Sequence, residues 1–167
     1  MVPFLYSQRL SVTKPRVFDF FATLRESTTL PIGAAGFCWG GKFVVLLCAD
    51  TEKTSSGKSL IDAGYTAHPS HVAMPTDIEQ VKLPLCISNG TLDIQLKPEG
   101  METIKGIFKE KEKEFGTGKF EMNVIEGARH GFAVRGNPGD EEEKKRGQLA
   151  EDQAVDFFKR WLVQGKA

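Results

Sequence analysis

Three side chains that can cooperate in covalent catalysis, Cys38, Asp93 and His130, each come just after a stretch that is predicted to be a β-strand. A cysteine thiolate can attack a carbonyl carbon, an imidazole can move protons, and a carboxylate can hold the imidazole in one tautomer. In an open parallel sheet, functional groups collect in the loops beyond the carboxyl ends of the strands. We therefore predict that these three side chains meet at one edge of a sheet.

Cys38 lies in the sequence Gly36-Phe-Cys-Trp-Gly-Gly41, which predicts a tight turn between a strand and a helix. Glycines at 36, 40 and 41 lack the β-carbons that would collide when a strand reverses into a helix within a few residues. With serine in place of cysteine, the motif would be the nucleophile elbow of the α/β-hydrolases, whose triads follow the same chain order. The thiol would also lie at the positive end of the helix dipole, which favours the thiolate.

Each of the three residues also has a purely structural interpretation. A G-x-C-x-G sequence recurs by chance as a glycine-rich turn with a buried cysteine. Asp93 follows Asn89-Gly90 and could serve as an Asx-turn residue in a loop. His130 lies in a predicted loop rather than on an apolar helical face, which favours a site over a core position. The agreement of all three in order and placement favours catalysis over these alternatives.

The remaining histidines and cysteines suggest less chemistry. His68 and His71 follow a predicted strand and are separated by Pro69-Ser70, which indicates a structured turn, with His68 as a candidate for lining a pocket. No carboxylate stands at ligand spacing from either histidine, so no metal site is expected. Cys48 and Cys86 lie inside apolar runs and are most simply core residues.

Strands and helices alternate along the chain, which predicts a parallel α/β sheet with right-handed crossovers. The strands are predicted at residues 30–37, 61–67, 81–88 and 119–125. Asn89-Gly90 is predicted to close the third strand, and the alternating pattern of the fourth is typical of an edge strand with one wet face.

The helices are predicted from their start signals and their apolar spacing. Thr13 is expected to cap a first helix of about three turns. Pro98 is expected to open an amphipathic helix that Gly116 ends, and the last helix is expected to bury apolar side chains from Leu149 to Leu162. The stretch 126–140, which holds His130, is predicted to be a loop.

Composition limits the range of functions. The 167 residues fit a single domain covering positions 1–167, and the 22 basic and 22 acidic residues cancel, so neither nucleic acid nor a membrane surface is an expected partner. The three cysteines are too few for a disulfide framework and none forms a C-x-x-C pair, which indicates a reducing compartment. With no signal-peptide pattern and no membrane-spanning run, we expect a cytoplasmic protein.

The motifs GFCWGGK, GTLD and ARHGFAVRG, at these intervals, resemble the dienelactone hydrolase family over nearly the whole chain from Thr13 onward. The resemblance implies an α/β-hydrolase fold in which Cys38 is the nucleophile, Asp93 the acid and His130 the base. It also implies that the backbone amide of Trp39 is one oxyanion donor. Members open lactones or enol esters through a thioacyl intermediate and need no cofactor.

By the same resemblance, an arginine shortly after the histidine helps to hold an anionic substrate, and the nearest such residue is Arg135. An arginine in this position could grip a substrate carboxylate through two hydrogen bonds, although Arg129 and Arg135 could equally be solvated loop residues. We therefore expect a small ester or lactone as the substrate, and a carboxylate on it would fit an arginine at this position.

One departure from the family concerns the region before the elbow. The family fold places the elbow on its fifth strand, whereas about thirty residues precede the elbow here, so the chain resembles the C-terminal part of that fold. The second oxyanion amide and the carboxylate that contacts the resting cysteine in relatives would then be absent. The strand that leads into Cys38 is expected to be an open edge, which invites pairing with a second copy of the chain.

Two other functions remain open at this stage. One is a fragment or pseudoenzyme that serves as an interaction module through its exposed strand edge. The other is a cysteine enzyme similar to the glutamine amidotransferases, which usually place a glutamate two residues after the histidine; that position here is Phe132. The leading hypothesis is a hydrolase of the dienelactone hydrolase type, whose activity would be impaired by loss of the second oxyanion amide in this short form.

Overall fold

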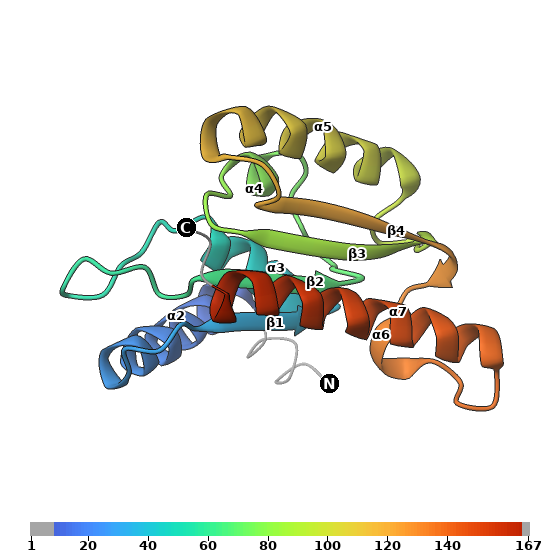
Figure 1. Cartoon of the computed structure of the whole chain (residues 1–167), viewed down its shortest axis with the longest axis horizontal. Helices are drawn as coiled ribbons and strands as arrows, with labels where there is room; N and C mark the ends of the chain where they lie inside the picture. Colours follow the sequence, from blue (N-terminus) through green and yellow to red (C-terminus); the bar gives the residue numbers. More distant parts are fainter. Residues whose placement is uncertain (1–8, 165–167) are drawn as a thin grey trace.

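The computed structural model describes residues 9–164, and its centre is a sheet of four parallel strands (Figure 1). The strands are β1 (Gly33–Phe37), β2 (Ala63–Ala67), β3 (Leu85–Leu92) and β4 (Phe120–Arg129). Their order in the sheet is β1-β2-β3-β4, with parallel pairing throughout. The predicted parallel α/β architecture is therefore confirmed.

Helices cover both faces of this sheet. The helices are α2 (Leu10–Ser27), α3 (Trp39–Cys48), α4 (Thr76–Glu79), α5 (Pro98–Phe115), α6 (Phe132–Arg135) and α7 (Glu141–Phe158), the last continuing as a π-helix over Lys159–Val163. Helices α2 to α5 pack their apolar side chains with one face of the sheet, whereas α6 and α7 pack against the other. None of the helices between residues 9 and 164 combines the length and apolar character needed to cross a membrane.

Each face of the sheet has its own core cluster. On the α3 and α5 side, Val45, Leu85 and Ile104 are almost completely buried. On the α7 side, Tyr65 and Phe157 are almost completely buried, and the Tyr65 hydroxyl donates a hydrogen bond of 2.8 Å to the carbonyl of Ala150. This bond fixes α7 over β2, and burial of apolar area on both faces stabilises the sheet at about 25 cal/mol per Å².

The first helix begins earlier than predicted. Thr13 does not cap it, because the amides of Val12 and Thr13 already donate to the carbonyl of Arg9. Pro15 therefore lies inside α2 rather than at its start. Other elements match the prediction: α5 starts at Pro98 and its C-cap is Gly116, whose φ of 93° suits glycine.

The third strand does not stop at Asn89-Gly90, as was predicted, but continues to Leu92. Gly90 stands opposite β4 at a register shift, and a β-carbon there would overlap the backbone of Ala128. Gly90 thus permits a close approach between two strands rather than a turn, and Asp93 follows the end of β3 directly. The fourth strand is also longer than predicted and runs to Arg129, which places His130 immediately after it.

Two short helices, α4 and α6, were not predicted, and α6 lies within the stretch 126–140 that was expected to be a loop. Leu149 was expected to be buried but is 45% exposed, whereas Ala150 and Phe157 on the same helix are buried as expected.

The α7 helix starts after Asp140, whose carboxylate accepts hydrogen bonds from the amides of Glu142 and Glu143.

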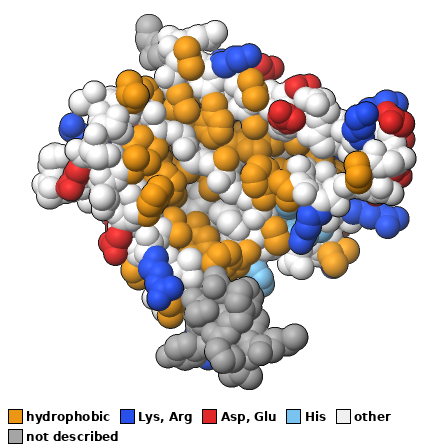
Figure 2. All heavy atoms as spheres, turned by 90° about the horizontal axis from the view of Figure 1, so that it is seen from below, with side chains coloured by type: hydrophobic (Ala, Val, Ile, Leu, Met, Phe, Trp, Pro, Cys, Tyr) orange, Lys and Arg blue, Asp and Glu red, His pale blue; other side chains and the backbone are white. Residues whose placement is uncertain are grey.

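Within the described residues, β1 and β4 are the outer strands of the sheet. Figure 2 views the molecule from the β1 side and shows hydrophobic side chains over much of that face. The exposed apolar residues include Phe37 at the end of β1, Leu30 just before it, and Val155 on α7. The unpaired edge that was expected beside the elbow strand is therefore present in the described part of the chain.

Candidate active site

Cys38 lies at the turn between β1 and α3, with φ and ψ of 53° and −120°. Few non-glycine residues adopt such angles, and strain of this kind is concentrated at functional sites. A β-carbon at Gly36 would come within 2.5 Å of the carbonyl oxygen of Gly40, and one at Gly41 within 2.8 Å of the β-carbon of Pro69. A β-carbon at Gly40 would meet no described atom within 4 Å. Only two of the three glycines are therefore needed for space, contrary to the prediction.

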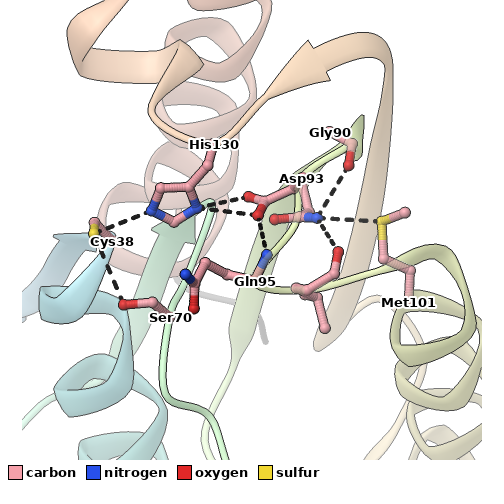
Figure 3. A network of polar contacts seen from close by, with 9 residues as sticks. Cys38, Ser70, Gly90, Asp93, Gln95, Met101 and His130 are labelled. Carbon is pink, nitrogen blue, oxygen red and sulfur yellow. Dashed lines mark hydrogen bonds and ion pairs between the residues drawn. The ribbon is translucent and has the colours of Figure 1, made fainter.

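The structure brings the three predicted side chains together at the carboxyl end of the sheet (Figure 3). The Nε2 atom of His130 lies 3.1 Å from the sulfur of Cys38. The Nδ1 atom of the same ring lies 2.9 and 3.1 Å from the two carboxylate oxygens of Asp93. Sulfur, imidazole and carboxylate are therefore in line, within the distances that a nucleophile, a base and an orienting acid require.

Asp93 is 2% exposed and is held by its own backbone neighbours. Its Oδ1 atom accepts a hydrogen bond of 2.7 Å from the amide of Gln95, and its amide donates to the carbonyl of Gly90. The Asx-turn interpretation and the triad interpretation of Asp93 are thus not exclusive, because one carboxylate forms the turn and also contacts His130.

The electrostatics of the pair favour a thiolate facing an imidazolium. Burial alone would raise the pKa of Cys38, but hydrogen bonds from His130, Ser70 and the amide of Trp39 outweigh it and lower that pKa. Burial alone would lower the pKa of His130, but its hydrogen bonds to Cys38 and Asp93 raise that pKa. Both shifts act in the direction of a proton on the imidazole and a negative charge on sulfur.

His68 has no exposed surface and contacts the site through its ring rather than lining an open pocket. Its ring centroid lies 5.1 Å from that of His130 in an edge-to-face arrangement, with Phe37 and Phe132 packed beside it. Both ring nitrogens are buried and have no hydrogen-bond partner among residues 9–164. Burial, followed by the nearby charge of His130, lowers the pKa of His68 to about 4, so this ring is neutral near pH 7.

Arg135 is exposed at the end of α6 and lines an open pocket of about 490 Å³ together with His130. Arg129 and Arg146 also line this pocket, as do the acidic residues Asp140 and Glu143. A second pocket of about 500 Å³ lies between β1, α6 and α7, and no member of the trio lines it. Of these two pockets, the first is therefore the one that His130 lines.

Cys48 and Cys86 are buried inside the core as predicted, and burial raises the pKa of both thiols. Among residues 9–164, no group of three or more His, Cys, Asp or Glu side chains is placed to hold a metal ion. Lys42, which ends the elbow motif, forms a buried ion pair with Asp77 on α4 and so anchors α3.

Ser70 was not predicted to be part of the site. Its hydroxyl lies 3.8 Å from the sulfur of Cys38 and its amide donates a hydrogen bond of 2.9 Å to the carbonyl of Cys38. Its position could have predicted this role, because Ser70 follows the carboxyl end of β2, the strand next to the elbow strand. Gln95 contacts Asp93 through its backbone amide, so its residue type could not have predicted the contact.

The four parallel strands define an α/β-hydrolase-like fold, with a sharp strand-to-helix turn after the first strand, an acid after the third and a histidine after the fourth. The model of the dienelactone hydrolase family matches residues 5–162. The chain belongs to the dienelactone hydrolase family.

Curated relatives agree with this assignment. The hydrolase tropI of Talaromyces stipitatus is 34% identical over 131 residues, which cover 78% of this chain and 46% of the relative. The hydrolase pyvD of Aspergillus violaceofuscus is 27% identical over 145 residues, which cover 84% of this chain and 54% of the relative. The chain thus spans about half the length of the curated relatives that it matches.

Solved structures show the same fold. A structure described as a putative dienelactone hydrolase from Klebsiella pneumoniae superposes with a TM-score of 0.57 at 18% identity, covering 77% of this chain and 52% of that one. The acylaminoacyl peptidase of Pyrococcus horikoshii superposes with a TM-score of 0.58 at 16% identity, covering 90% of this chain and 27% of that one.

Proposed function

We propose that the protein is a hydrolase that cleaves a small ester or lactone through a thioacyl intermediate on Cys38. The observation that carries this proposal is the continuous line from sulfur to imidazole to carboxylate, with contacts of 3.1 and 2.9 Å. Membership of the dienelactone hydrolase family and two curated relatives named as hydrolases support it. Because the chain spans about half of those relatives, its own activity remains part of the proposal.

The proposed reaction has two halves. The Cys38 thiolate attacks the carbonyl carbon, and the amide of Trp39 at the start of α3 stabilises the negative charge that develops on the carbonyl oxygen. The tetrahedral intermediate then collapses, the carbon–oxygen bond to the leaving group breaks, and the His130 imidazolium donates its proton to the departing oxygen. For a lactone, the leaving oxygen stays attached to the acyl chain.

In the second half, neutral His130 takes a proton from a water molecule, and the resulting hydroxide attacks the thioester. The carboxylic acid leaves, sulfur returns to the thiolate, and His130 keeps the proton, which restores the starting pair. Asp93 stabilises the imidazolium in the first state and holds its Nδ1 proton in the second. Asp93 is suited to this task because it is buried and fixed by Gln95.

The pocket beside His130 suggests the chemistry of the substrate. Arg135, Arg129 and Arg146 line it, and an exposed guanidinium can hold a substrate carboxylate through two hydrogen bonds. We therefore extend the proposal to substrates that carry a carboxylate near the scissile ester, with Arg135 as the contact.

A second candidate function is suggested by the outer edge of β1. An unpaired strand with exposed apolar neighbours, including Phe37 and Leu30, is suited to pairing with another chain. In this alternative the chain is an interaction module that forms a homodimer through β1. A stable dimer without esterase activity would favour the module, and an active monomer would exclude it.

The proposed activity is tested by trapping the acyl group. The protein is incubated with p-nitrophenyl acetate at pH 7, quenched in acid, and digested for mass spectrometry. We expect the acetyl group on Cys38, with no label after Cys38→Ala and full label after Cys48→Ala as the matched control. Labelling of Cys48 or Cys86 without Cys38 would contradict the proposal.

A further inference from the structure

Ser70 occupies a place in the site that the triad does not account for. It is 4% exposed, and its hydroxyl oxygen lies 3.8 Å from the sulfur of Cys38, within reach of a hydrogen bond to sulfur. In Figure 3 the contacts from Ser70 and His130 meet at the sulfur from different directions. The sulfur of Cys38 is the shared partner of a serine hydroxyl and an imidazole.

The backbone fixes Ser70 in this position. The carbonyl of Cys38 accepts hydrogen bonds from the amides of both Ser70 and Gly41, at 2.9 and 3.1 Å. The segment 68–71 therefore docks onto the elbow itself. The start of this segment is also fixed, because the amide of His68 donates a hydrogen bond of 2.8 Å to the carbonyl of Ser88 on β3.

Two further features show how closely this segment is held. His68 and His71, on either side of Pro69-Ser70, have φ values of 42° and 59°, which are uncommon for residues other than glycine. Pro69 packs where a β-carbon of Gly41 would lie. The second glycine of the elbow pair is thus explained by the approach of the Ser70 segment.

We propose that the Ser70 hydroxyl is a second hydrogen-bond donor to the Cys38 thiolate, acting beside His130 to keep the sulfur ionised and aimed. The inference deepens the proposed function and rests on Cys38 being its nucleophile. The hydroxyl keeps its own proton throughout, because it donates a hydrogen bond and takes no part in bond making. Its particular value comes in the second half of the reaction, when sulfur leaves the acyl group as an anion.

The titratable groups around the sulfur are few. His130 faces it directly, Asp93 acts on it through His130, and His68 packs against the His130 ring. Ser70 is uncharged, so removing its hydroxyl changes no charge in this group. A change in the ionisation of Cys38 after such a substitution therefore reports the hydrogen bond itself.

The test is the pH dependence of alkylation of Cys38 by iodoacetamide, located by peptide mass spectrometry. The matched pair is Ser70→Val and Ser70→Thr, which have nearly the same shape and differ in the hydroxyl. Ser70→Ala is the simple deletion. Ser88→Ala is the control for loss of a buried serine, since the Ser88 hydroxyl bonds Gln153 instead.

We expect the midpoint of the alkylation profile to rise by about half to one pH unit in Ser70→Ala and Ser70→Val, with little change in the rate at high pH. Ser70→Thr and Ser88→Ala should keep the parent midpoint. An unchanged midpoint in Ser70→Ala, or equal shifts in the Val and Thr variants, would overturn the inference. Alkylation needs no ester, so a shifted midpoint in a protein that fails to become acylated would reject the proposed function alone.

Discussion

The Nε2 atom of His130 contacts the sulfur of Cys38 at 3.1 Å although 92 positions separate the two residues in the chain. Two strands, β2 and β3, lie between β1 and β4, and the contact is possible because both residues follow the carboxyl ends of their strands, at the same end of the sheet. Of the three cysteines, Cys38 is the one in contact with this imidazole, while Cys48 and Cys86 are buried in the core.

Removing the proposed nucleophile should abolish ester hydrolysis. We expect Cys38→Ala to lower kcat/KM for an activated aryl ester by at least roughly a thousandfold, because His130 and Asp93 cannot support acylation without the sulfur. Cys86→Ala, which changes a buried thiol outside the site, should keep the rate per folded molecule. The measurement is release of p-nitrophenolate, with folding checked by circular dichroism. Comparable rates in the two variants would rule out Cys38.

The carboxylate of Asp93 should matter more for catalysis than for binding. Asp93→Asn keeps the shape but removes the charge that holds the His130 ring, so kcat should fall by roughly a hundredfold to ten-thousandfold while KM changes little. Asn123→Asp, at an amide on β4 whose partner is Cys86, offers a control for a change of one charge away from the trio. A loss of affinity with unchanged kcat would assign Asp93 to substrate binding instead.

The pair of shifted groups predicts the pH profile of acylation. The pKa of Cys38 is lowered and that of His130 is raised, so both shifts favour the thiolate and imidazolium forms. Acylation should rise with pH as Cys38 ionises and fall as His130 loses the proton that the leaving group needs. Stopped-flow acylation rates measure both limbs. His130→Gln should raise the pH at which Cys38 becomes reactive toward iodoacetamide.

His68 should make the protein sensitive to acid. Its pKa of about 4 in the fold is below the ordinary value of 6.5, so above that value both folded and unfolded states are neutral and stability is unaffected. As pH falls from 6.5 toward 4, only the unfolded state gains the proton, and up to about 3 kcal/mol of stability is lost. Urea unfolding at pH 7 and pH 5 measures this difference.

Two histidine variants separate this effect from other acid effects. His68→Asn should reduce the difference between the two pH values, because asparagine tolerates a positive φ and does not titrate. His71→Asn changes an exposed histidine with a similar backbone angle and should leave the difference intact. Equal pH dependence in the parent and His68→Asn proteins would contradict the assignment.

The elbow glycines should differ in their tolerance of alanine. A β-carbon at Gly41 would overlap Thr66 and Pro69, so Gly41→Ala should cost about 1–3 kcal/mol of unfolding free energy. Gly40 faces open space, so Gly40→Ala should be neutral or stabilising by up to about 1 kcal/mol. Urea unfolding compares the two, and equal losses would contradict the packing described here.

Much of this fold follows from local pattern. The apolar runs and start signals predicted every strand and the long helices, because burial on both sides of a parallel sheet leaves continuous apolar sequence. The trio of Cys38, Asp93 and His130 was predictable because each follows a strand, and topology then places all three at one edge. Strand ends were less predictable, since Gly90 reads as a turn but serves a close contact with Ala128.

Contacts between segments that are far apart in the chain could not be predicted from local sequence pattern. Ser70 reaches the sulfur only because the segment after β2 folds over the elbow, and serine is common in turns for other reasons. His68 looked like a pocket residue, yet its burial beside Phe132 became visible only with α6 in place. Leu149 was expected to be buried but is exposed, although the next residue, Ala150, is buried against Tyr65 of β2.

The arrangement of strands also governs when the sulfur becomes reactive during synthesis. The elbow emerges from the ribosome before β4, so the contact between Cys38 and His130 can form only after β4 has been made. The proposed nucleophile therefore lacks its proposed base while the chain is being synthesised. The part of Cys38 alkylation that depends on His130 should then report completion of the sheet.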